Sequence, residues 1–377
     1  MADVYNWQLG RKMEYIYEEH HPRKQISWVY DLNKCIGCHT CSLGCKTTWT
    51  SGRGQEYMFW NSVETKPYGY WPLGWDVRLL EVLGVQEWKG DKYNGKTIFE
   101  AAGPEKAFLG FLPETEDWAY PNLGEDDLSS PVEKGSHFSL PHIAWMFYFP
   151  RTCNHCTYPA CLAACPRKAI YKREEDGVVL IDQHRCRGYR ECIRACPYKR
   201  PMFNTVSKVS EKCIACYPAL AEGVQSRCVV NCIGKIRIQG FKNRHDKPDP
   251  ENPIDFLVHF KKIGLPIYPQ FGLEPNLYYI PPIHVPIPYL RQMFGPGAAQ
   301  AVATYQRMRE GKEPEIQAIL HLMTSTEYIV TRFLVKGSEV IGYDEKQKEV
   351  VRVPVREPIH VRPHYDEKLA VYRHNIT

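Results

Sequence analysis

The segment "CNHCTYPACLAACP" (residues 153–166) is followed closely by "CRGYRECIRACP" (residues 186–197). Each segment contains closely spaced cysteines and ends in a cysteine that directly precedes a proline. Bacterial ferredoxins carry the run C-x2-C-x2-C-x3-C-P, in which three thiolates bind one iron-sulfur cluster and the fourth binds the neighbouring cluster. The two segments therefore predict a ferredoxin-like unit with two clusters.

The fifteen cysteines of this 377-residue chain all fall into four such groups. The groups are Cys35, Cys38, Cys41 and Cys45; Cys153, Cys156, Cys161 and Cys165; Cys186, Cys192 and Cys196; and Cys213, Cys216, Cys228 and Cys232. A disulfide framework fits poorly, because the total is odd, C-x2-C steps repeat and the chain starts without a secretion signal. Structural zinc sites also use C-x2-C pairs. They rarely contain four cysteines separated by two, two and three residues, as the first group does. The pattern favours iron-sulfur clusters.

The last cysteine of each group indicates which cysteines bind the same cluster. In a two-cluster ferredoxin this cysteine starts a short helix and completes the cluster of the partner group. Groups two and three both end in Cys-Pro and are close in sequence, so we expect them to pair, which leaves groups one and four to pair with each other. The expected 4Fe-4S ligand sets are Cys35, Cys38, Cys41 and Cys232; Cys45, Cys213, Cys216 and Cys228; and Cys153, Cys156, Cys161 and Cys196.

The fourth set contains only three cysteines, namely Cys165, Cys186 and Cys192. Tyr189 stands where the ferredoxin pattern has a further cysteine. Three thiolates suit a 3Fe-4S cluster, with Tyr189 filling the corner that a fourth iron would occupy. A 4Fe-4S cluster that uses tyrosinate or water as its fourth ligand is the alternative.

An internal repeat indicates the fold class. "SWVYDLNKCIGCHTC" (residues 27–41) aligns with "VVLIDQHRCRGYREC" (residues 178–192), and each follows a short β-type run. "KREEDGVVLID" predicts a hairpin that turns at Asp176-Gly177. We expect an α+β protein of two interleaved ferredoxin-like double-cluster units, with long irregular insertions and a C-terminal extension.

Five parts of the chain are expected on this interpretation. They are an N-terminal arm (1–25), a unit with two 4Fe-4S clusters (26–50 plus 205–245), an insertion (51–140), a unit with one 4Fe-4S and one 3Fe-4S cluster (141–204), and a C-terminal extension that docks on partner subunits (246–377). Within the insertion, the acidic stretch 113–127 is expected to be a solvated loop. Residues 276–297 are rich in proline and predict an extended arm, whereas Pro314 starts a predicted core helix and 340–355 predict a hairpin.

No motif for substrate chemistry accompanies the cysteines. The sequence contains no P-loop, no dinucleotide fingerprint and no convincing nucleophile-base pair. A net charge of +5 without a long basic block gives no reason to expect nucleic acid, and no apolar run approaches the roughly 20 residues of a membrane span. We therefore expect a non-catalytic conductor of single electrons.

Basic and histidine side chains near the cysteines offer further candidates. Positive charge near an anionic cluster favours its reduced form and raises its potential, although such residues can also simply neutralise charge or face solvent. The basic candidates are Arg185, Arg187, Arg190, Arg194, Lys199 and Arg200. For His39, His155 and His184 we expect surface or loop-stabilising roles rather than control of a cluster potential.

The four cysteine groups, the third of which has Tyr189 at a position where the ferredoxin pattern has a cysteine, resemble those of a known family. This family consists of the electron-transfer β subunits of respiratory molybdenum enzymes related to dimethyl sulfoxide reductase. This family includes nitrate, perchlorate, chlorate and selenate reductases, and ethylbenzene and dimethylsulfide dehydrogenases. The phrases "YNWQLGRKM", "GQEYMFWNSVETKPYG", "SEKCIACYP", "EPNLYYIPP" and "YLRQMFGPG" are most similar to those of nitrite-oxidising members. Members of the family often carry tryptophan where this chain has Tyr189; both are bulky non-ligands, so the 3Fe-4S expectation is unchanged.

The resemblance implies partners and a compartment. It implies an α subunit with a molybdenum bis-pterin site that oxidises nitrite to nitrate, a haem-binding γ subunit and a cytochrome c acceptor. The start of the chain has neither an apolar h-region nor a twin-arginine pair, so export would depend on a partner's signal. The expected location is the periplasm or an internal compartment such as the anammoxosome, with a cytoplasmic, membrane-associated location as the alternative. A free polyferredoxin and a zinc-stapled scaffold are the competing interpretations.

Overall fold

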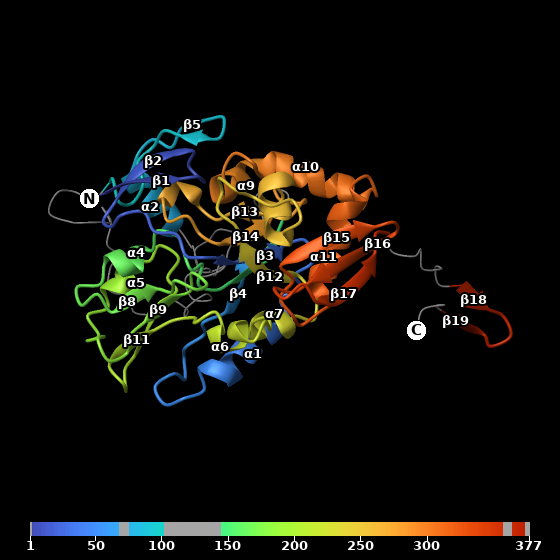
Figure 1. Ribbon diagram of the computed structural model, residues 1–377, viewed down its shortest axis with the longest axis horizontal. Coiled ribbons are helices and arrows are strands. Elements are labelled where there is room, and N and C mark those ends of the chain that lie inside the picture. The colour runs from blue at the N-terminus through green and yellow to red at the C-terminus, as the bar shows by residue number, and fades with distance from the viewer. Residues whose placement is uncertain (1, 68–74, 102–144, 357–363, 374–377) are drawn as a thin grey trace, which may run out of the picture.

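A four-stranded sheet forms the centre of the protein (Figure 1). The computed structural model describes four stretches of the chain: residues 2–67, 75–101, 145–356 and 364–373. Strand β3 (Gln25–Asp31) is buried along its whole length. It pairs antiparallel with β12 (Arg237–Lys242) and parallel with β14 (Leu277–Ile280), which in turn pairs with β13 (Leu265–Pro266).

This sheet brings the first and last cysteine groups to the same place. β3 leads into group one, and β12 begins directly after group four, with Arg237 paired to Tyr30 in the strand register. Helix α1 (Thr40–Trp49) contacts the short helix α7 (Arg227–Val230). Gly44 permits this approach, because a Cβ atom there would lie 2.0 Å from the side-chain nitrogen of Asn231.

Groups two and three belong to a smaller, adjoining set of elements. The hairpin predicted at Asp176-Gly177 is confirmed, and Gly177 has a φ of +71° at the turn. The elements are β8 (Ile170–Lys172), β9 (Val179–Ile181), β10 (Met202–Asn204), β11 (Val209–Glu211), α4 (Ala160–Ala163) and α5 (Glu191–Ala195). Helix α6 (Tyr217–Ala221) follows Cys216 of group four and lies near α1 and α7 (Figure 1). α4 contacts α5, so that the ends of groups two and three lie together.

The prediction of an extended arm at 276–297 is wrong. Leu277–Ile280 form β14 inside the central sheet, and Ile287–Phe294 form helix α9. The prolines flank these elements instead of interrupting them: Pro281 follows the strand, and Pro288 occupies the first turn of the helix. Proline is tolerated there because the first helical N–H groups have no partner within the helix. A high proline content therefore does not by itself exclude a strand or a helix, because the positions of the prolines decide.

The segments before group two form small antiparallel pairs. Residues 2–15, expected to be an arm, form a hairpin whose side chains Val4, Met13 and Tyr15 are buried. The elements are β1 (Ala2–Asn6), β2 (Arg11–Tyr15), β4 (Ser62–Lys66), α2 (Trp75–Leu83), β5 (Trp88–Lys89), β6 (Lys92–Tyr93) and β7 (Phe147–Arg151). β4 pairs with β7 immediately before group two. The acidic stretch 113–127 lies outside the described residues.

The C-terminal part adds helices and a three-stranded sheet. The predicted helix at Pro314 is confirmed as α11 (Pro314–Thr324), which buries Ile316, Ile319 and Met323, and the hairpin predicted at 340–355 is confirmed. The other elements are α8 (Pro253–Asp255), a π-helix (Phe256–Phe260), a 3-10 helix (Pro269–Phe271), α10 (Ala298–Arg309), β15 (Arg332–Lys336), β16 (Glu339–Tyr343), β17 (Glu349–Pro354), β18 (His364–Asp366) and β19 (Val371–Arg373). None of the helices in the described ranges is long and apolar enough to cross a membrane.

Loss of the buried Glu64 carboxylate should destabilise the fold. Lys66 Nζ lies 3.2 Å from Glu64 Oε2, Arg151 also pairs with this carboxylate, and all three side chains are buried. Burial raises the pKa of Glu64, but Arg151 and Lys66 oppose it and lower the pKa overall. We expect Glu64→Gln to reduce the free energy of unfolding by about 3–5 kcal/mol, because buried cations lose their counter-ion.

Chemical denaturation of the cluster-loaded protein measures this effect. The stabilisation by Glu64 is present above the pKa of an unfolded glutamate and is lost as the pH falls through the lower folded-state pKa. The difference between the wild type and Glu64→Gln should therefore shrink on acidification. Glu339→Gln is the matched control, since the pair that Glu339 forms with Arg352 is solvent-exposed. Equal losses in both variants would contradict the expectation.

Candidate metal centres

Site three is defined here as the cavity that contains Cys153, Cys156, Cys161 and Cys196. All four thiols are buried. Cys153 and Cys156 lie in the loop after β7, and Cys161 lies in α4. Cys196 comes from group three, directly after α5, and joins the other three because α4 and α5 are in contact. The structure thus brings together the complete set that the spacing predicted for the third cluster.

Site two combines one thiol of group one with three thiols of group four. Cys45 of α1 lines one cavity together with Cys213, Cys216 and Cys228. The contact between α1 and α7 places Cys45 opposite Cys228. Trp49 donates a hydrogen bond from Nε1 to Cys216 Sγ at 3.1 Å. This is the second complete set that the sequence predicted.

Site one is defined here as the predicted set Cys35, Cys38, Cys41 and Cys232, of which the structure brings three together. Burial, and then the nearby Cys41 and Cys232, raise the pKa of Cys35 to about 11, although Gly37 and Arg237 oppose them. These three thiols are therefore neighbours. Cys38 lies at the surface, with its sulfur 3.2 Å from the hydroxyl of Thr40. Site one thus reaches the solvent on one side.

Site four holds three thiols and one tyrosine. Cys165, Cys186 and Cys192 line one cavity with Tyr189, as predicted. The Tyr189 side chain is 59% exposed, so it forms the outer rim of the cavity. Backbone N–H groups of Ala169 and Ser210 donate to the sulfurs of Cys165 and Cys186, at 3.3 and 3.4 Å. Such donors stabilise a negatively charged thiolate.

The arrangement of the thiols fits clusters of several metal ions. All fifteen cysteines are free, so no disulfide is formed. Within the four described stretches, no three His, Cys, Asp or Glu side chains converge closely enough to hold a single metal ion. The thiols instead surround cavities, as expected when each thiolate binds a different iron of one cluster. Burial raises the pKa of Cys192 and Cys216 to about 12, so binding of iron must be coupled to loss of the thiol proton.

Each of the four sites has thiols of the next site among its electrostatic neighbours. Arg237 interacts with Cys41 and Cys232 of site one and with Cys228 of site two. Burial and then Cys153 of site three raise the pKa of Cys213 in site two. Among the neighbours that raise the pKa of Cys161 in site three is Cys192 of site four. The order is therefore one, two, three, four, with the two middle sites buried and the two end sites reaching the surface.

Comparisons with known proteins identify the family of this chain. A family model described as a 4Fe-4S dicluster domain matches residues 144–242. The selenate reductase β subunit of Thauera selenatis is 40% identical over 330 residues, which cover 79% of this chain and 96% of that protein. The chlorate reductase β subunit of Ideonella dechloratans is 39% identical with the same coverage. The dimethylsulfide dehydrogenase β subunit of Rhodovulum sulfidophilum is 38% identical over 77% of this chain and 92% of its own length.

This chain belongs to the family of molybdoenzyme β subunits. It is an electron-transfer subunit that carries iron-sulfur clusters, as the 4Fe-4S dicluster match and the four thiol-lined sites indicate together. The β subunits of this family work with a catalytic molybdenum subunit. The absence of a substrate-chemistry motif in the sequence agrees with this role.

The basic residues of the β subunit that were expected beside group three are found at two different sites. Arg200 lies beside Cys196 of group three, as expected, and its buried side chain lines site three. Arg200 donates to the backbone oxygens of Phe59 and Trp60, at 2.9 and 2.8 Å. Arg187 and Arg190 do line site four, as expected, and both are exposed. Cys196 lines site three, so the basic residue that follows it lies there, whereas those close to Cys186 line site four.

The histidines differ in environment. His39 and His184 are exposed. His155 is fully buried in the wall of site three, and its Nδ1 accepts a hydrogen bond from the backbone N–H of Val179 at 3.0 Å. Burial, and then Lys212 and Lys172, hold its pKa well below the usual value. His155 is thus a neutral side chain that supports the ligand loop, as expected.

Sequence reasoning missed two buried cations between the sites. Arg237 donates a hydrogen bond from Nη2 to Cys41 Sγ at 3.1 Å. Lys212 Nζ lies 3.0 Å from the backbone oxygen of Cys213 in site two and 3.8 Å from Cys153 Sγ in site three. The only local signal for Arg237 is a basic residue inside the apolar strand "KIRIQG". Its partners are too distant in sequence to have been predicted.

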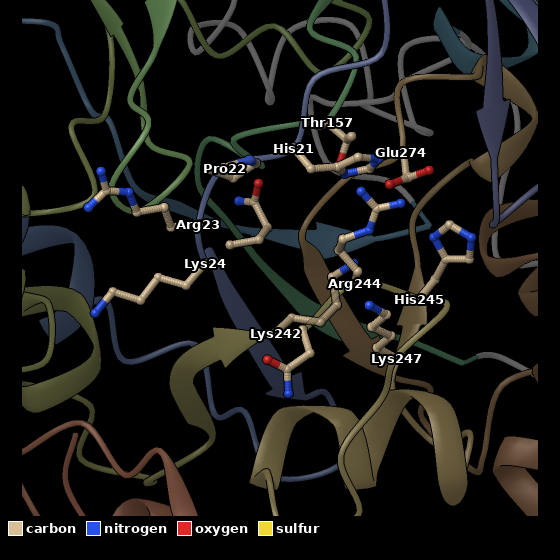
Figure 2. Close-up of a pocket in the computed structure, with 12 residues that line it drawn as sticks. His21, Pro22, Arg23, Lys24, Thr157, Lys242, Arg244, His245, Lys247 and Glu274 are labelled. Atoms are coloured by element: carbon tan, nitrogen blue, oxygen red, sulfur yellow. The ribbon is translucent and has the colours of Figure 1, made fainter. Parts of the chain in front are cut away.

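A larger cavity lies apart from the thiols (Figure 2). Its lining includes the basic side chains of Lys24, Lys242, Arg244 and Lys247 and the carboxylate of Glu274. It contains no cysteine. This cavity is therefore not part of the four candidate metal centres.

Proposed function

We propose that this β subunit conducts electrons through four clusters, from a molybdenum subunit that oxidises nitrite to nitrate towards a haem-binding γ subunit or cytochrome c. Sites one, two and three each hold a 4Fe-4S cluster on the four cysteines assigned above. Site four holds a 3Fe-4S cluster on Cys165, Cys186 and Cys192. The observation that carries the proposal is the linear order of the sites, with buried sites in the middle and a surface-accessible site at each end.

The two ends suit different roles in this proposal. Around site one, the apolar side chains of Ile36, Leu43 and Ile233 are 62, 57 and 65% exposed. Apolar surface of this kind is suited to burial against another protein, so we assign this end to the catalytic subunit. At site four, Arg187 and Arg190 bring positive charge to the cavity. Positive charge favours the reduced cluster and raises its potential, which suits the exit end.

Nitrite is proposed as the donor because of the phrases that resemble nitrite-oxidising members. Nitrite is a weak reductant, so its electrons need acceptors of fairly high potential. A three-iron cluster in a cationic setting at the exit end would draw electrons onward. The pairing of β3 with β12 supports the proposal of two interleaved double-cluster units. We further propose that the complex works in the periplasm or an equivalent internal compartment.

Reduction of an oxyanion is the second candidate function. It is favoured by the identities of 40% and 39% to selenate and chlorate reductase β subunits, along almost their whole length. Electrons would then run in the opposite direction, from site four to site one. The same four sites serve both directions, because electron transfer between neighbouring clusters is reversible.

Enzyme assays on the assembled complex distinguish the two functions. The complex should reduce a high-potential dye or cytochrome c with nitrite as donor. The β subunit alone should contain about fifteen irons, from three four-iron clusters and one three-iron cluster, and should oxidise no nitrite. A complex that reduces selenate or chlorate but does not oxidise nitrite would establish the second candidate. Potentiometric titration adds an independent check, since a three-iron cluster with the lowest potential of the four would contradict the proposed direction.

A further inference from the structure

Arg237 is a buried cation between site one and site two. It is the first residue of β12, and its side chain is 1% exposed. Nη1 donates hydrogen bonds to the Tyr30 hydroxyl at 3.0 Å and to Asn61 Oδ1 at 2.7 Å. Nη2 donates to Cys41 Sγ at 3.1 Å. The guanidinium also lies over the ring of Tyr30, with 4.4 Å between Cζ and the ring centroid. These contacts hold it in one position.

The counter-charges of Arg237 are thiols and not carboxylates. Among the described residues, Arg237 forms hydrogen bonds to the Tyr30 hydroxyl, Asn61 Oδ1 and Cys41 Sγ and forms no ion pair with a carboxylate. By contrast, the buried Arg151 pairs with the carboxylate of Glu64. A buried charge is strongly unfavourable unless it is paired and hydrogen-bonded. The negative charge that compensates Arg237 must therefore come from the thiolates of sites one and two, which make the clusters they hold anionic.

The guanidinium keeps its charge whichever form the neighbouring cluster takes. An arginine guanidinium stays protonated in folded proteins at any working pH. When a cluster accepts one electron, its negative charge grows by one and no proton needs to move, because Arg237 is already protonated. A nearby fixed cation and an N–H donor to a ligand sulfur both stabilise the reduced cluster.

We propose that Arg237 is the shared counter-ion of the first and second clusters and raises the reduction potentials of both, with the larger effect on the first. This inference rests on the proposed function, in which sites one and two each hold a 4Fe-4S cluster. The first cluster is affected more because Nη2 bonds directly to its ligand Cys41. Because the reduction potentials of both clusters are raised, these clusters can accept electrons from a weak reductant and pass them to the cluster at site three.

Redox titration of the assembled complex, followed by electron paramagnetic resonance, tests the inference. Arg237→Gln should lower the equilibrium constant for reduction of the first cluster about tenfold or more, which equals about 59 mV for one electron. The second cluster should shift less, and the clusters at sites three and four should be unchanged. Arg227→Gln is the matched control: Arg227 precedes Cys228 in sequence, but its side chain is exposed. Because solvent screens an exposed charge, its loss should shift the potential of the second cluster by less than Arg237→Gln shifts that of the first, and should leave the other three potentials unchanged.

Two further variants separate charge from geometry. Arg237→Lys keeps the charge but cannot reproduce the forked hydrogen bonds of arginine. The reduction potential of the second cluster should therefore return almost to its wild-type value, whereas that of the first cluster should stay lower than in the wild type. Asn61→Asp leaves Arg237 in place and gives it a carboxylate partner at the Oδ1 position. It should lower the first potential as Arg237→Gln does. If Arg237→Gln fails to load iron, Asn61→Asp decides the question.

Unchanged potentials of the first two clusters in Arg237→Gln or in Asn61→Asp would overturn the inference, as would equal shifts at all four sites. A failure of the proposed function looks different. It would appear in the wild type as an iron content well below about fifteen, or as the absence of the first cluster's signal. The iron content of every variant is therefore measured before its potentials are compared.

Discussion

Tyr189→Cys should convert the three-iron cluster into a four-iron cluster. Tyr189 lines site four beside Cys165, Cys186 and Cys192, and its exposed side chain leaves room for a smaller residue at the rim. A thiolate at this position supplies the ligand that the fourth iron lacks. The oxidised protein should lose its 3Fe-4S paramagnetic signal completely and gain about one iron per chain. Iron analysis and electron paramagnetic resonance of the purified protein measure both changes.

Tyr189→Phe is the control for this substitution. Phenylalanine keeps the ring and removes only the hydroxyl group, so the three-iron signal should persist. If the tyrosine oxygen were instead the ligand of a four-iron cluster, Tyr189→Phe would change the cluster and the wild type would show no three-iron signal. A persistent three-iron signal in Tyr189→Cys would mean that another feature of site four excludes the fourth iron.

Cys45→Ala should remove the cluster of site two and spare that of site one. Cys45 follows Cys41 by one helical turn of α1, yet the thiols that raise its pKa after burial are Cys213, Cys228 and Cys216. Loss of one of four thiolates leaves an incomplete cluster site, so about four irons should be lost per chain. Electrons would then have to cross from site one to site three, and transfer through the complex should stop.

Comparison of variants identifies which cluster is lost. The spectrum missing from Cys45→Ala should equal the spectrum missing from Cys213→Ala and differ from that missing from Cys35→Ala. Thr48→Ala provides the matched control, because Thr48 is an exposed residue of the same helix. A Cys45→Ala protein with the same deficiency as Cys35→Ala would show that the last cysteine of group one stays with its sequence neighbours.

The cysteine sets were predictable because the information is local. Short loops with C-x2-C steps present thiols to one centre, and the cysteine of the following helix points away from its own loop. The structure brings together the thiols expected at sites two, three and four, and three of the four expected at site one. The hairpin at Asp176-Gly177 and the helix at Pro314 were predictable for the same reason, since turn residues and apolar spacing act over a few positions.

Other features depended on contacts between distant parts of the chain. The strand 277–280 enters the central sheet by pairing with 28–31, and nothing within the proline-rich segment itself specifies that partner. Arg200 donates hydrogen bonds to the backbone oxygens of Phe59 and Trp60, which lie 141 and 140 positions away in the sequence. Composition and spacing describe neither relationship.

The sequence by itself determined the type of centre, since cysteine spacing sets which thiols can meet around one cluster. Only the tertiary structure decided the order of the sites and the charges between them. That order depends on the pairing of β3 with β12 and on the packing of α1 against α7, which join residues some 200 positions apart, as Arg237 and Cys41 illustrate with a separation of 196. A buried cation acquires its role from the groups that surround it in space, and those groups are assembled only when the chain has folded.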